Sequence, residues 1–393
     1  MAVVAIDGGE LTVGGGLLAL VRPALRLLEE DGIVAVLSSS ASVVDDLPSW
    51  CRAEGHEYLG SEETAGGARR YLIGRGRFSL RAAQEAGEAM PERADPITGF
   101  APRGADVEPG GPAYPFDLLE RDHLAPPEIR KLYEQAVAAQ WNASRDIPWD
   151  KAGGHAPALE AAVVQIMTFL AENELSALYL PSKFISRIHP AYAEVSMFLA
   201  TQLADEARHI EVFLRRARLS GPRLGVSSVT TSRSLLSLLE LSDFSEAAFL
   251  LSVLGEGTFL DLLGYVERHA PDEATAELVH RARTDESRHV HFGLAHVRAA
   301  LACDSTLYAR LEQAVRHRAA TLHGVAGVPA PVQDALIVLA ARGTEPGAVA
   351  RGHAAFRELL DTMHASRVKR LLHAGFTPEQ ADTISQLHTA NFM

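Results

Sequence analysis

The spacing of hydrophobic positions separates the first part of the chain from the rest. From residue 1 to about 78, short hydrophobic runs such as "VVAI", "GIVAVLSS" and "RRYLIG" alternate with segments in which hydrophobic positions recur every three or four residues. This alternation of β-rich runs with helical patterns is typical of a small α/β structure. We therefore expect a separate α/β two-layer sandwich domain over residues 1–80.

A segment with neither period follows. Residues 81–128 include "MPERADPITGFAPRGADVEPGGPAYPFD", which is rich in proline, glycine and acidic residues. Such a composition sustains neither a strand nor a helix and is typical of a linker. The main domain boundary is expected here.

Beyond the linker the pattern is helical almost to the end of the chain, with breaks at proline or glycine. Long helices are predicted at about 157–179, 190–219, 243–269 and 271–301, and shorter ones after them. Four long helices with short or moderate connections indicate a bundle. The predicted fold is thus multidomain and mainly α, with a helical bundle over 129–302 and a C-terminal helical extension over 303–393.

Composition and charge narrow the possible partners. The chain has 393 residues, of which 47% are hydrophobic and 22% charged, and a net charge of −13. Proteins that neutralise phosphate groups concentrate lysine and arginine, so neither nucleic acid nor a membrane is expected as a partner. The start of the chain lacks a signal-peptide pattern and no apolar run approaches membrane-spanning length, so a cytoplasmic protein is expected. Cys51 and Cys303 match no metal or redox spacing and are expected to be reduced, partly buried thiols.

One five-residue motif occurs twice. "DEARH" at 205–209 returns as "DESRH" at 285–289, each within a predicted long helix. A spacing of three residues places the glutamate and the histidine of each copy on one face of a helix, so both can point to a common position in a bundle core. One copy would be weak evidence for a metal site, but two copies that share Asp, Glu, Arg and His are strong evidence.

A site for two metals needs a further carboxylate from each of the other two helices. Glu256 stands alone in the apolar run "AAFLLSVLGEGTFLDLLGYV", where unpaired burial would cost on the order of several kcal/mol, which favours a ligand role. "TFLAENELSALYL" offers both Glu172 and Glu174, which point to different faces. We prefer Glu174, because it lies 32 residues before Glu206, close to the 30 between Glu256 and Glu286; Glu172 is the alternative.

The other repeated positions suggest a layer of residues that supports the ligands. Asp205 and Asp285 can accept a hydrogen bond from the outer N–H of a ligating histidine, while Arg208 and Arg288 can hold those aspartates. The alternative interpretation is a set of ordinary ion pairs on helix surfaces.

Two features near the predicted ligands have more than one interpretation. Gly255 and Gly257 flank Glu256 although a glycine inside a helix costs on the order of 1 kcal/mol relative to alanine. They can clear space beside the metals, allow a local π-bulge, or permit close helix packing. The segment "WNASRDIPW" at 141–149 is either a lead-in to the first ligand helix, similar to that of a less characterised bacterial subfamily of ferritin-like proteins, or a turn anchored by tryptophan.

Six of these residues together resemble the ligand set of the ferritin-like non-haem di-iron carboxylate proteins, which include ferritins, ribonucleotide reductase small subunits and bacterial multicomponent monooxygenases. The resemblance covers residues 157–301. It implies that two iron ions, or iron with manganese in one position, are bound, with Glu206 and Glu286 as bridging ligands. The implied metal ligands are Glu174, Glu206, His209, Glu256, Glu286 and His289.

Departures from the family pattern narrow the branch. The reductase small subunits carry a radical-bearing tyrosine four residues after the first ligand histidine, where this chain has Phe213. Multicomponent monooxygenases commonly carry a hydroxyl residue four positions after the third-helix glutamate, where this chain has Leu260, with Thr258 nearer. Neither radical storage nor close membership of the monooxygenase group is therefore expected.

The N-terminal domain resembles the small sulfur-carrier domains of the TusA/SirA type over most of residues 3–76, including "LRLLEEDGIVAVLSSSASVVDDLPSWCRAEGHEYLGSEETAGGARRYLIGRG". Those domains carry a reactive cysteine at the start of their first helix, where this sequence has Val13 in "TVGGGLL". A docking or structural role is expected instead of sulfur transfer.

Three functions are compatible with the sequence. The first is an O₂-activating di-iron oxidase or oxygenase that hydroxylates, desaturates or N-oxygenates a small organic substrate, with an outside electron donor or reductase. The second is a ferroxidase or other iron-handling protein without an organic substrate, and the third is a metal-free scaffold. The first is preferred, because the extra helices and the separate domain suit a closed substrate pocket. A homodimer is the default oligomeric state.

Overall fold

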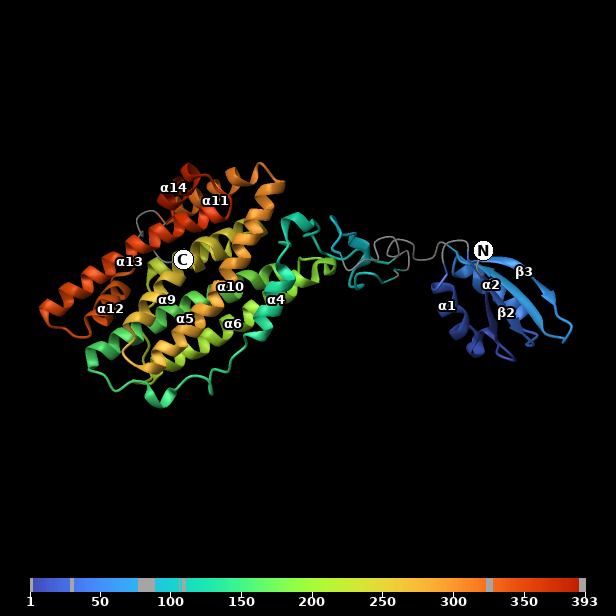
Figure 1. The fold of residues 1–393 in the computed structure, drawn as a ribbon, viewed down its shortest axis with the longest axis horizontal. Helices are drawn as coiled ribbons and strands as arrows, with labels where there is room; N and C mark the ends of the chain where they lie inside the picture. The colour runs from blue at the N-terminus through green and yellow to red at the C-terminus, as the bar shows by residue number, and fades with distance from the viewer. Residues whose placement is uncertain are drawn as a thin grey trace. The chain divides into compact units, whose positions relative to one another are not determined.

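The computed structural model of the chain describes residues 3–28, 32–76, 89–105, 107, 111–322 and 328–388 (Figure 1). The chain forms two compact units, one made of Met1–Ala89 with Ile97–Tyr114 and the other of Met90–Pro96 with Pro115–Met393. Of the predicted linker, residues 90–96 and 115–128 therefore belong to the larger unit, while 81–88, 106 and 108–110 lie outside the described residues.

The smaller unit contains a four-stranded sheet in the order β1-β2-β4-β3, in which β1 and β2 are parallel and the other neighbours antiparallel. Its elements are β1 Val3–Asp7, η1 Val13–Leu17, α1 Leu18–Arg26, β2 Ile33–Ser38, α2 Val43–Ala53, β3 Glu57–Glu63 and β4 Arg69–Gly74. Buried residues of α1 and α2 form one hydrophobic cluster with Val34, Val36, Tyr71 and Ile73 of the sheet. These are the two layers predicted from the sequence.

Strand β3 was not predicted from the hydrophobic pattern. Its sequence, "EYLGSEE", is rich in glutamate and contains a glycine. An edge strand tolerates such residues, because only the side chains on one of its faces need to be buried. Cys51 is buried, which raises the pKa of its thiol to about 11, in keeping with a structural role. Cys303, in the larger unit, is exposed rather than partly buried. The similarity of the smaller unit to sulfur carriers stays a prediction.

The larger unit is helical. Its α-helices are α4 Ile129–Ala138, α5 Pro157–Ile185, α6 Ala193–Arg218, α7 Val229–Leu239, α8 Phe244–Ala248, α9 Gly257–His269, α10 Glu273–Cys303, α11 Leu307–Thr321, α12 Ala330–Ala341, α13 Pro346–His373 and α14 Pro378–Leu387. A π-helical segment, η6 Phe249–Glu256, joins α8 to α9. Short 3₁₀ turns lie at η3 Arg121–His123, η4 Trp149–Lys151 and η5 Pro190–Tyr192, and η2 Pro96–Thr98 falls where the chain passes from the larger unit to the smaller one.

Four long helical segments form the bundle: α5, α6, α10, and the continuous run of α8, η6 and α9 (Figure 1). Helix α5 extends to Ile185, past the predicted end at 179, and accommodates Pro181 inside it. Local sequence fixes the helix starts, since the side chains of Asp243 and Asp272 cap α8 and α10 by accepting backbone N–H groups. Helices α12 and α13 cover α5 and α9. The predicted architecture, a four-helix bundle with extra C-terminal helices and a separate small α/β unit, is confirmed.

The segment Phe244–His269 is the most buried of the bundle. Contrary to the expectation from the sequence, it is long and apolar enough to cross a membrane by length and composition. Within the protein, however, 83% of its most apolar window is buried, and all eight residues of η6 are buried. This burial explains the hydrophobic sequence without a bilayer, since a helix surrounded by other helices is apolar on every side.

Candidate metal centre

Each of the four bundle segments contributes acidic side chains to one buried position. Glu174 comes from α5, Glu206 from α6, Glu256 from the end of η6, and Glu286 from α10, and none is more than 1% exposed. The choice between the two glutamates of α5 is explained by their faces: Glu172 is partly exposed and accepts a hydrogen bond from Ser227 at the surface, whereas Glu174 points into the bundle.

The donor atoms form two groups that share two carboxylates. Atoms of one group, and likewise of the other, lie within 4.8 Å of one another. The first group is Glu174, Glu206, His209 and Glu286, and the second is Glu206, Glu256, Glu286 and His289. Glu206 and Glu286 belong to both groups, as the bridging role implied by the resemblance requires, and all six predicted ligand residues meet at one place.

The inner nitrogen of each histidine faces the carboxylates. His209 Nδ1 lies 3.2 Å from Glu206 and 3.3 Å from Glu286. His289 Nδ1 lies 3.1 Å from Glu206 and 3.4 Å from Glu286. Glu174 is 3.6 Å from the first histidine. Carboxylate oxygens and imidazole nitrogens in this number suit iron and manganese.

The outer nitrogens of the histidines are held crosswise by the repeated aspartates. His209 Nε2 lies 3.1 Å from Asp285 Oδ2, and His289 Nε2 lies 3.3 Å from Asp205 Oδ2, so each histidine is paired with the aspartate of the other helix. An N–H donated to a carboxylate at Nε2 fixes the tautomer and leaves the lone pair of Nδ1 for a metal.

Two arginines close this layer into a ring. Arg208 contacts Asp205 of its own helix and lies 3.2 Å from Asp285, and Arg288 contacts Asp285 and lies 3.2 Å from Asp205. The four side chains are nearly or fully buried. These four side chains therefore form a buried network, and not the ordinary ion pairs on helix surfaces that were the alternative interpretation of the sequence.

Two further residues of this layer were missed by sequence reasoning. Trp141 donates its indole N–H to Asp285 Oδ2 at 2.7 Å, and its ring lies under the guanidinium of Arg208 at 4.7 Å. Gln140 donates to Asp205 at 3.0 Å and accepts from Arg208 at 2.7 Å. The segment "WNASRDIPW" was noticed for its tryptophans, but nothing in the sequence connected Trp141 with the aspartates.

Burial and neighbouring charges shift the pKa values of the predicted ligands, upward for some residues and downward for others. Burial, followed by repulsion from neighbouring carboxylates, raises the pKa of Glu174 and of Glu256 well above its usual value. Burial also acts against ionisation of Glu206, but the two histidines outweigh it and lower its pKa. Burial lowers the pKa of each histidine, yet the surrounding carboxylates raise it well above its usual value. Without metal ions the centre therefore retains protons, which metal ions replace.

The donor set fits two metal ions by charge as well as by geometry. The four glutamates, Asp205 and Asp285 against Arg208 and Arg288 leave four negative charges, which two divalent cations neutralise. Several inward-facing atoms also lack a well-oriented hydrogen bond among the described residues, although carboxylates and histidines crowd together here, which is costly for buried polar atoms unless a metal compensates. These atoms are Oε1 of Glu174 and Glu206, Oε2 of Glu256, both carboxylate oxygens of Glu286, and Nδ1 of His289.

A small apolar cavity adjoins the centre at Glu256. Gln202 of α6, which donates to Glu256 Oε1 at 3.0 Å, is one of its lining residues. The cavity has a volume of about 20 Å³ and lies between α5, α6, α8, η6 and α10. Its remaining lining residues are Leu180, Pro181, Phe184, Leu199, Phe244, Ala247, Ala248, Leu251, Ser252 and Phe292. Gln202 and Ser252 are its polar lining residues, and Gln202 connects it to Glu256.

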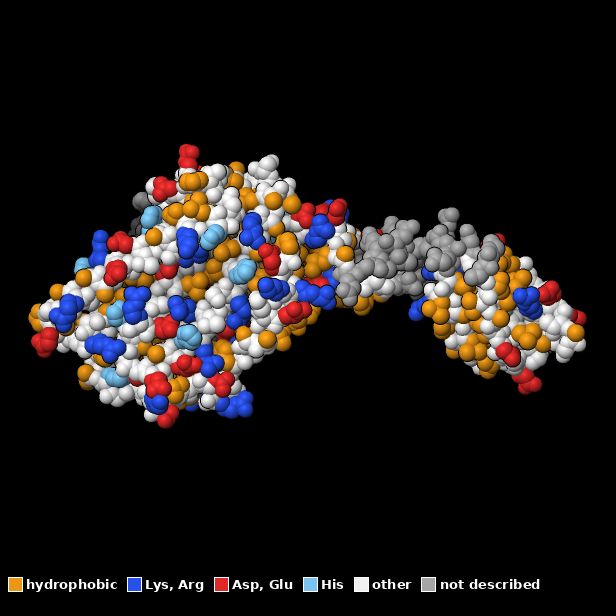
Figure 2. Space-filling view, viewed as in Figure 1, with side chains coloured by type: hydrophobic (Ala, Val, Ile, Leu, Met, Phe, Trp, Pro, Cys, Tyr) orange, Lys and Arg blue, Asp and Glu red, His pale blue; other side chains and the backbone are white. Residues whose placement is uncertain are grey.

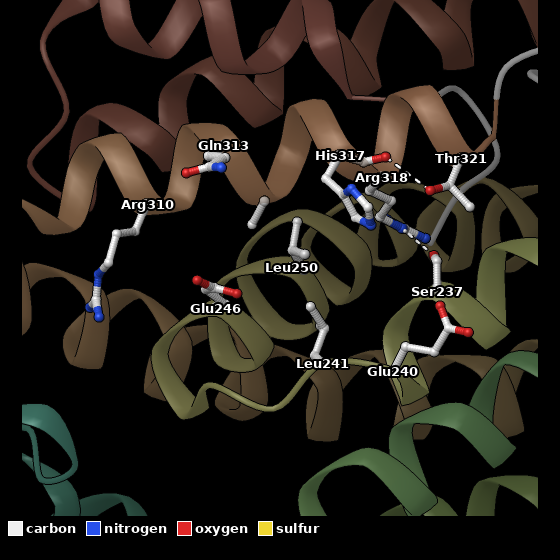
Figure 3. Close-up of a pocket in the computed structure, with 11 residues that line it drawn as sticks. Ser237, Glu240, Leu241, Glu246, Leu250, Arg310, Gln313, His317, Arg318 and Thr321 are labelled. Carbon is white, nitrogen blue, oxygen red and sulfur yellow. Dashed lines mark hydrogen bonds between the residues drawn. The ribbon is translucent and has the colours of Figure 1, made fainter.

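A larger pocket of about 430 Å³ lies on the outer side of the same helical run (Figure 3). Arg310, His317 and Arg318 of α11 line one side of it, and Glu246 and Leu250 lie opposite. None of the predicted ligands is among its lining residues. On the surface of the larger unit in view, basic, acidic and hydrophobic side chains are interspersed (Figure 2).

The other positions singled out in the sequence are placed as follows. Phe213 is buried, with its ring centre 6.3 Å from that of His209. Thr258 donates to the backbone of its own helix at Leu254. The glycines beside Glu256 lie where π-helix passes into α-helix, and a Cβ on Gly257 would come within 2.5 Å of Arg370. The local π-helix and close packing are therefore both present.

Comparison with known proteins gives a limited result. No family model matches the sequence, and no curated protein matches it. Similar solved structures include a variant of an R2-like ligand-binding oxidase with an aerobically reconstituted Mn/Fe cofactor, at 20% identity and a TM-score of 0.49, covering 62% of this chain and 93% of that chain. Another variant, with an Fe/Fe cofactor, matches at 20% identity and a TM-score of 0.48, covering 64% and 92%. The assignment of the metal ligands rests on the geometry of this chain.

Proposed function

We propose that the chain is an O₂-activating dimetal oxidase or oxygenase that acts on a small organic substrate, with two iron ions or one iron and one manganese ion. The observation that carries the proposal is the pair of donor groups that share Glu206 and Glu286, buried and short of four positive charges. Two such metal ions would supply the reduction of O₂ coupled to oxidation of the substrate. The ligands would be Glu174, Glu206, His209, Glu256, Glu286 and His289.

The chain's own side chains have three tasks in this proposal. The crosswise aspartates hold the histidines in the ligating tautomer and orientation. Gln202 fixes the rotamer of Glu256 on the side where the small cavity begins. The mostly apolar walls of that cavity, which at about 20 Å³ is too small for an organic substrate, limit the access of water to this side of the centre.

Hydroxylation, desaturation and N-oxygenation all fit these features. In a monooxygenase reaction one oxygen atom of O₂ enters the substrate and the other leaves as water, and an outside donor supplies two electrons. We therefore propose an electron donor or reductase as a partner, together with a cytoplasmic homodimer. For the TusA/SirA-like unit we propose a docking role, since Val13 stands where those carriers have their cysteine.

Metal content tests the dimetal centre first. The purified chain should bind about two metal ions per chain after anaerobic loading with Fe(II), and Glu206→Ala should lose both, because this carboxylate belongs to both donor groups. Glu174→Ala should lose one, while Glu172→Ala, two residues away at the surface, should bind as the unaltered protein does. Equal binding by Glu206→Ala and the unaltered protein would refute the centre.

Oxygen consumption then separates the two iron-based functions. The iron-loaded chain is mixed with O₂, a chemical reductant and sets of small amines, aromatic acids or fatty acids. Catalytic O₂ uptake that depends on one of these compounds and yields an oxidised product supports the oxygenase. Turnover of added Fe(II) to ferric mineral with no effect of organic compounds would show an iron-handling protein instead.

A further inference from the structure

A second group of buried charged side chains lies on the opposite side of the helix that carries Glu256. Glu256 faces α6, where it accepts from Gln202. Thr258 and Asp261, further along in α9, face α13 and contact Arg367 and Arg370. The width of α9 therefore separates this group from the metal ligands.

The two guanidinium groups have few and long hydrogen bonds. Arg367 is only 6% exposed, and its contacts are the backbone carbonyl of Ser385 at 3.3 Å, the hydroxyl of Ser385 at 3.4 Å and the hydroxyl of Thr258 at 3.5 Å. Arg370 Nη1 donates to Asp261 at 3.3 Å. Nε of Arg367 and both Nε and Nη2 of Arg370 are buried, and no described residue forms a hydrogen bond with them. Buried cations are normally held by shorter bonds to carboxylates.

The charges of the group do not balance among the described residues. Arg367 and Arg370 carry two positive charges, and Asp261 is the single carboxylate that the described residues bring into contact with them. Burial lowers the pKa of Arg367 to about 10, so it stays charged at neutral pH. Burial and the positive charges of Arg367, Arg318 and Arg370 hold the pKa of His388 well below its usual value, so the imidazole is neutral.

His388 adds a buried polar atom to the same place. The side chain is 8% exposed, and its Nε2 has no hydrogen-bond partner in the part of the chain that the structure describes. His388 is the C-cap residue of α14, less than one helical turn after Ser385, which Arg367 contacts. A neutral imidazole can donate one N–H, so the group offers a third donor beside two guanidinium groups.

Gly257 makes room for this arrangement. A Cβ at that position would lie 2.5 Å from Nε and 3.0 Å from Cδ of Arg370. The arginine therefore lies flat against the backbone of α9, one residue after Glu256. The glycine has a positional role here, since any side chain would displace a guanidinium whose only acceptor among the described residues is Asp261.

We propose that Arg367, Arg370 and His388 form a binding site for an oxyanion, the carboxylate or phosphate group of a small molecule. Planar guanidinium groups match both kinds of oxyanion, and a single negative charge offsets the excess positive charge. The ligand is a separate molecule from the substrate at the metals, because α9 lies between them. The site does not rest on the proposed oxidase function.

Thermal unfolding of the full chain tests the site. Inorganic phosphate and acetate are the probes, each at constant ionic strength set with chloride. A probe that occupies the site should raise the unfolding midpoint by about 5 °C when its concentration is about 100 times its Kd. Arg367→Met should abolish the rise, whereas Arg357→Met, an exposed arginine on the same helix, should leave it unchanged. Calorimetric titration should give one site per chain in the unaltered protein.

The outcomes distinguish the ligand classes. A rise with phosphate alone assigns the site to phosphate groups, and a rise with acetate alone assigns it to carboxylates. No rise beyond the chloride control, or an equal rise in Arg367→Met and the unaltered protein, overturns the proposal. If Arg367→Met does not fold, Arg370→Gln is measured in the same way, because it removes the other guanidinium and keeps a polar group of similar reach.

Discussion

The crosswise pairing of histidines and aspartates makes a prediction about which metal each aspartate supports. In Asp285→Asn the side chain keeps its size but loses its charge and one acceptor. In the structure, Oδ2 of Asp285 faces donors from His209 at 3.1 Å, Trp141 at 2.7 Å and Arg208 at 3.2 Å, while Oδ1 accepts from Arg288. In either orientation of the amide, its NH₂ group faces another donor. The hydrogen bond that holds His209 Nε2 is therefore weakened.

The expected magnitude follows from what such supporting residues contribute. Removing one typically costs about 10- to 100-fold in metal affinity, which is about 1.4–2.7 kcal/mol. The loss should concern the donor group of Glu174 and His209, although Asp285 lies in the same helix as His289. Asp205→Asn should conversely weaken the donor group of Glu256 and His289.

Single-site backgrounds separate the two effects. In Glu174→Ala only the donor group with His289 is complete, so adding Asp205→Asn should lower the affinity for Mn(II) or Fe(II) about 10- to 100-fold, and adding Asp285→Asn should change it by less than about threefold. In Glu256→Ala the order should reverse. Affinity is measured by anaerobic titration against a competing chelator. Equal losses from both aspartate variants in one background would refute the crosswise assignment.

Three further predictions concern stability. Burial lowers the pKa of His296 to about 4 in the folded chain. As the pH falls from 6.5 to 4, the histidine therefore takes up a proton in the unfolded state only, and the free energy of unfolding decreases by about 1.4 kcal/mol per pH unit. His296→Gln should remove this part of the pH dependence. Gly293→Ala should lower the free energy of unfolding by about 1–3 kcal/mol, because its Cβ would lie 2.6 Å from a side chain of the π-helical segment. Arg216→Met should cost about 3–5 kcal/mol, because it leaves buried Glu160 without its cation.

Urea unfolding followed by circular dichroism measures all three, with suitable controls. Gly347→Ala, where the added Cβ meets only one atom at 3.9 Å, should be neutral or stabilising by up to about 1 kcal/mol. A His296→Gln chain that loses stability as steeply as the unaltered chain below pH 6.5 would contradict the assignment of a neutral buried imidazole. A change of less than about 0.5 kcal/mol in Arg216→Met would show that the buried pair contributes little.

Much of the architecture, and the meeting of the six side chains in the bundle, was predictable because both leave periodic marks in the sequence. Long amphipathic or apolar runs predicted the four bundle segments, and the repeated motif located Glu206, His209, Glu286 and His289 on matching faces. The isolated Glu256 was visible because a charge in an apolar run needs compensation. Each of these signals lies within a single predicted helix, and the repeated motif gains its weight from its second copy.

The parts that were not predicted depend on contacts between distant segments. Spacing within one helix cannot show that a histidine is paired with the aspartate of another helix, or that Trp141 reaches Asp285 across 144 residues. The same holds for Arg370 against Gly257: the glycine was noticed, but its partner lies more than 100 residues away. Strand β3 escaped detection for a different reason, since an edge strand requires little hydrophobic pattern.

The crosswise layer also has a mechanical consequence for α6 and α10. Because each helix holds the histidine of the other, sliding one past the other by a single turn of about 5.4 Å would break both pairings at once. The two pairings therefore fix the position of α6 along α10, and the two helices should move as one rigid body. A motion that opens a path to the metal centre should then be a displacement of α5 or of the π-helical segment, each of which carries one predicted ligand.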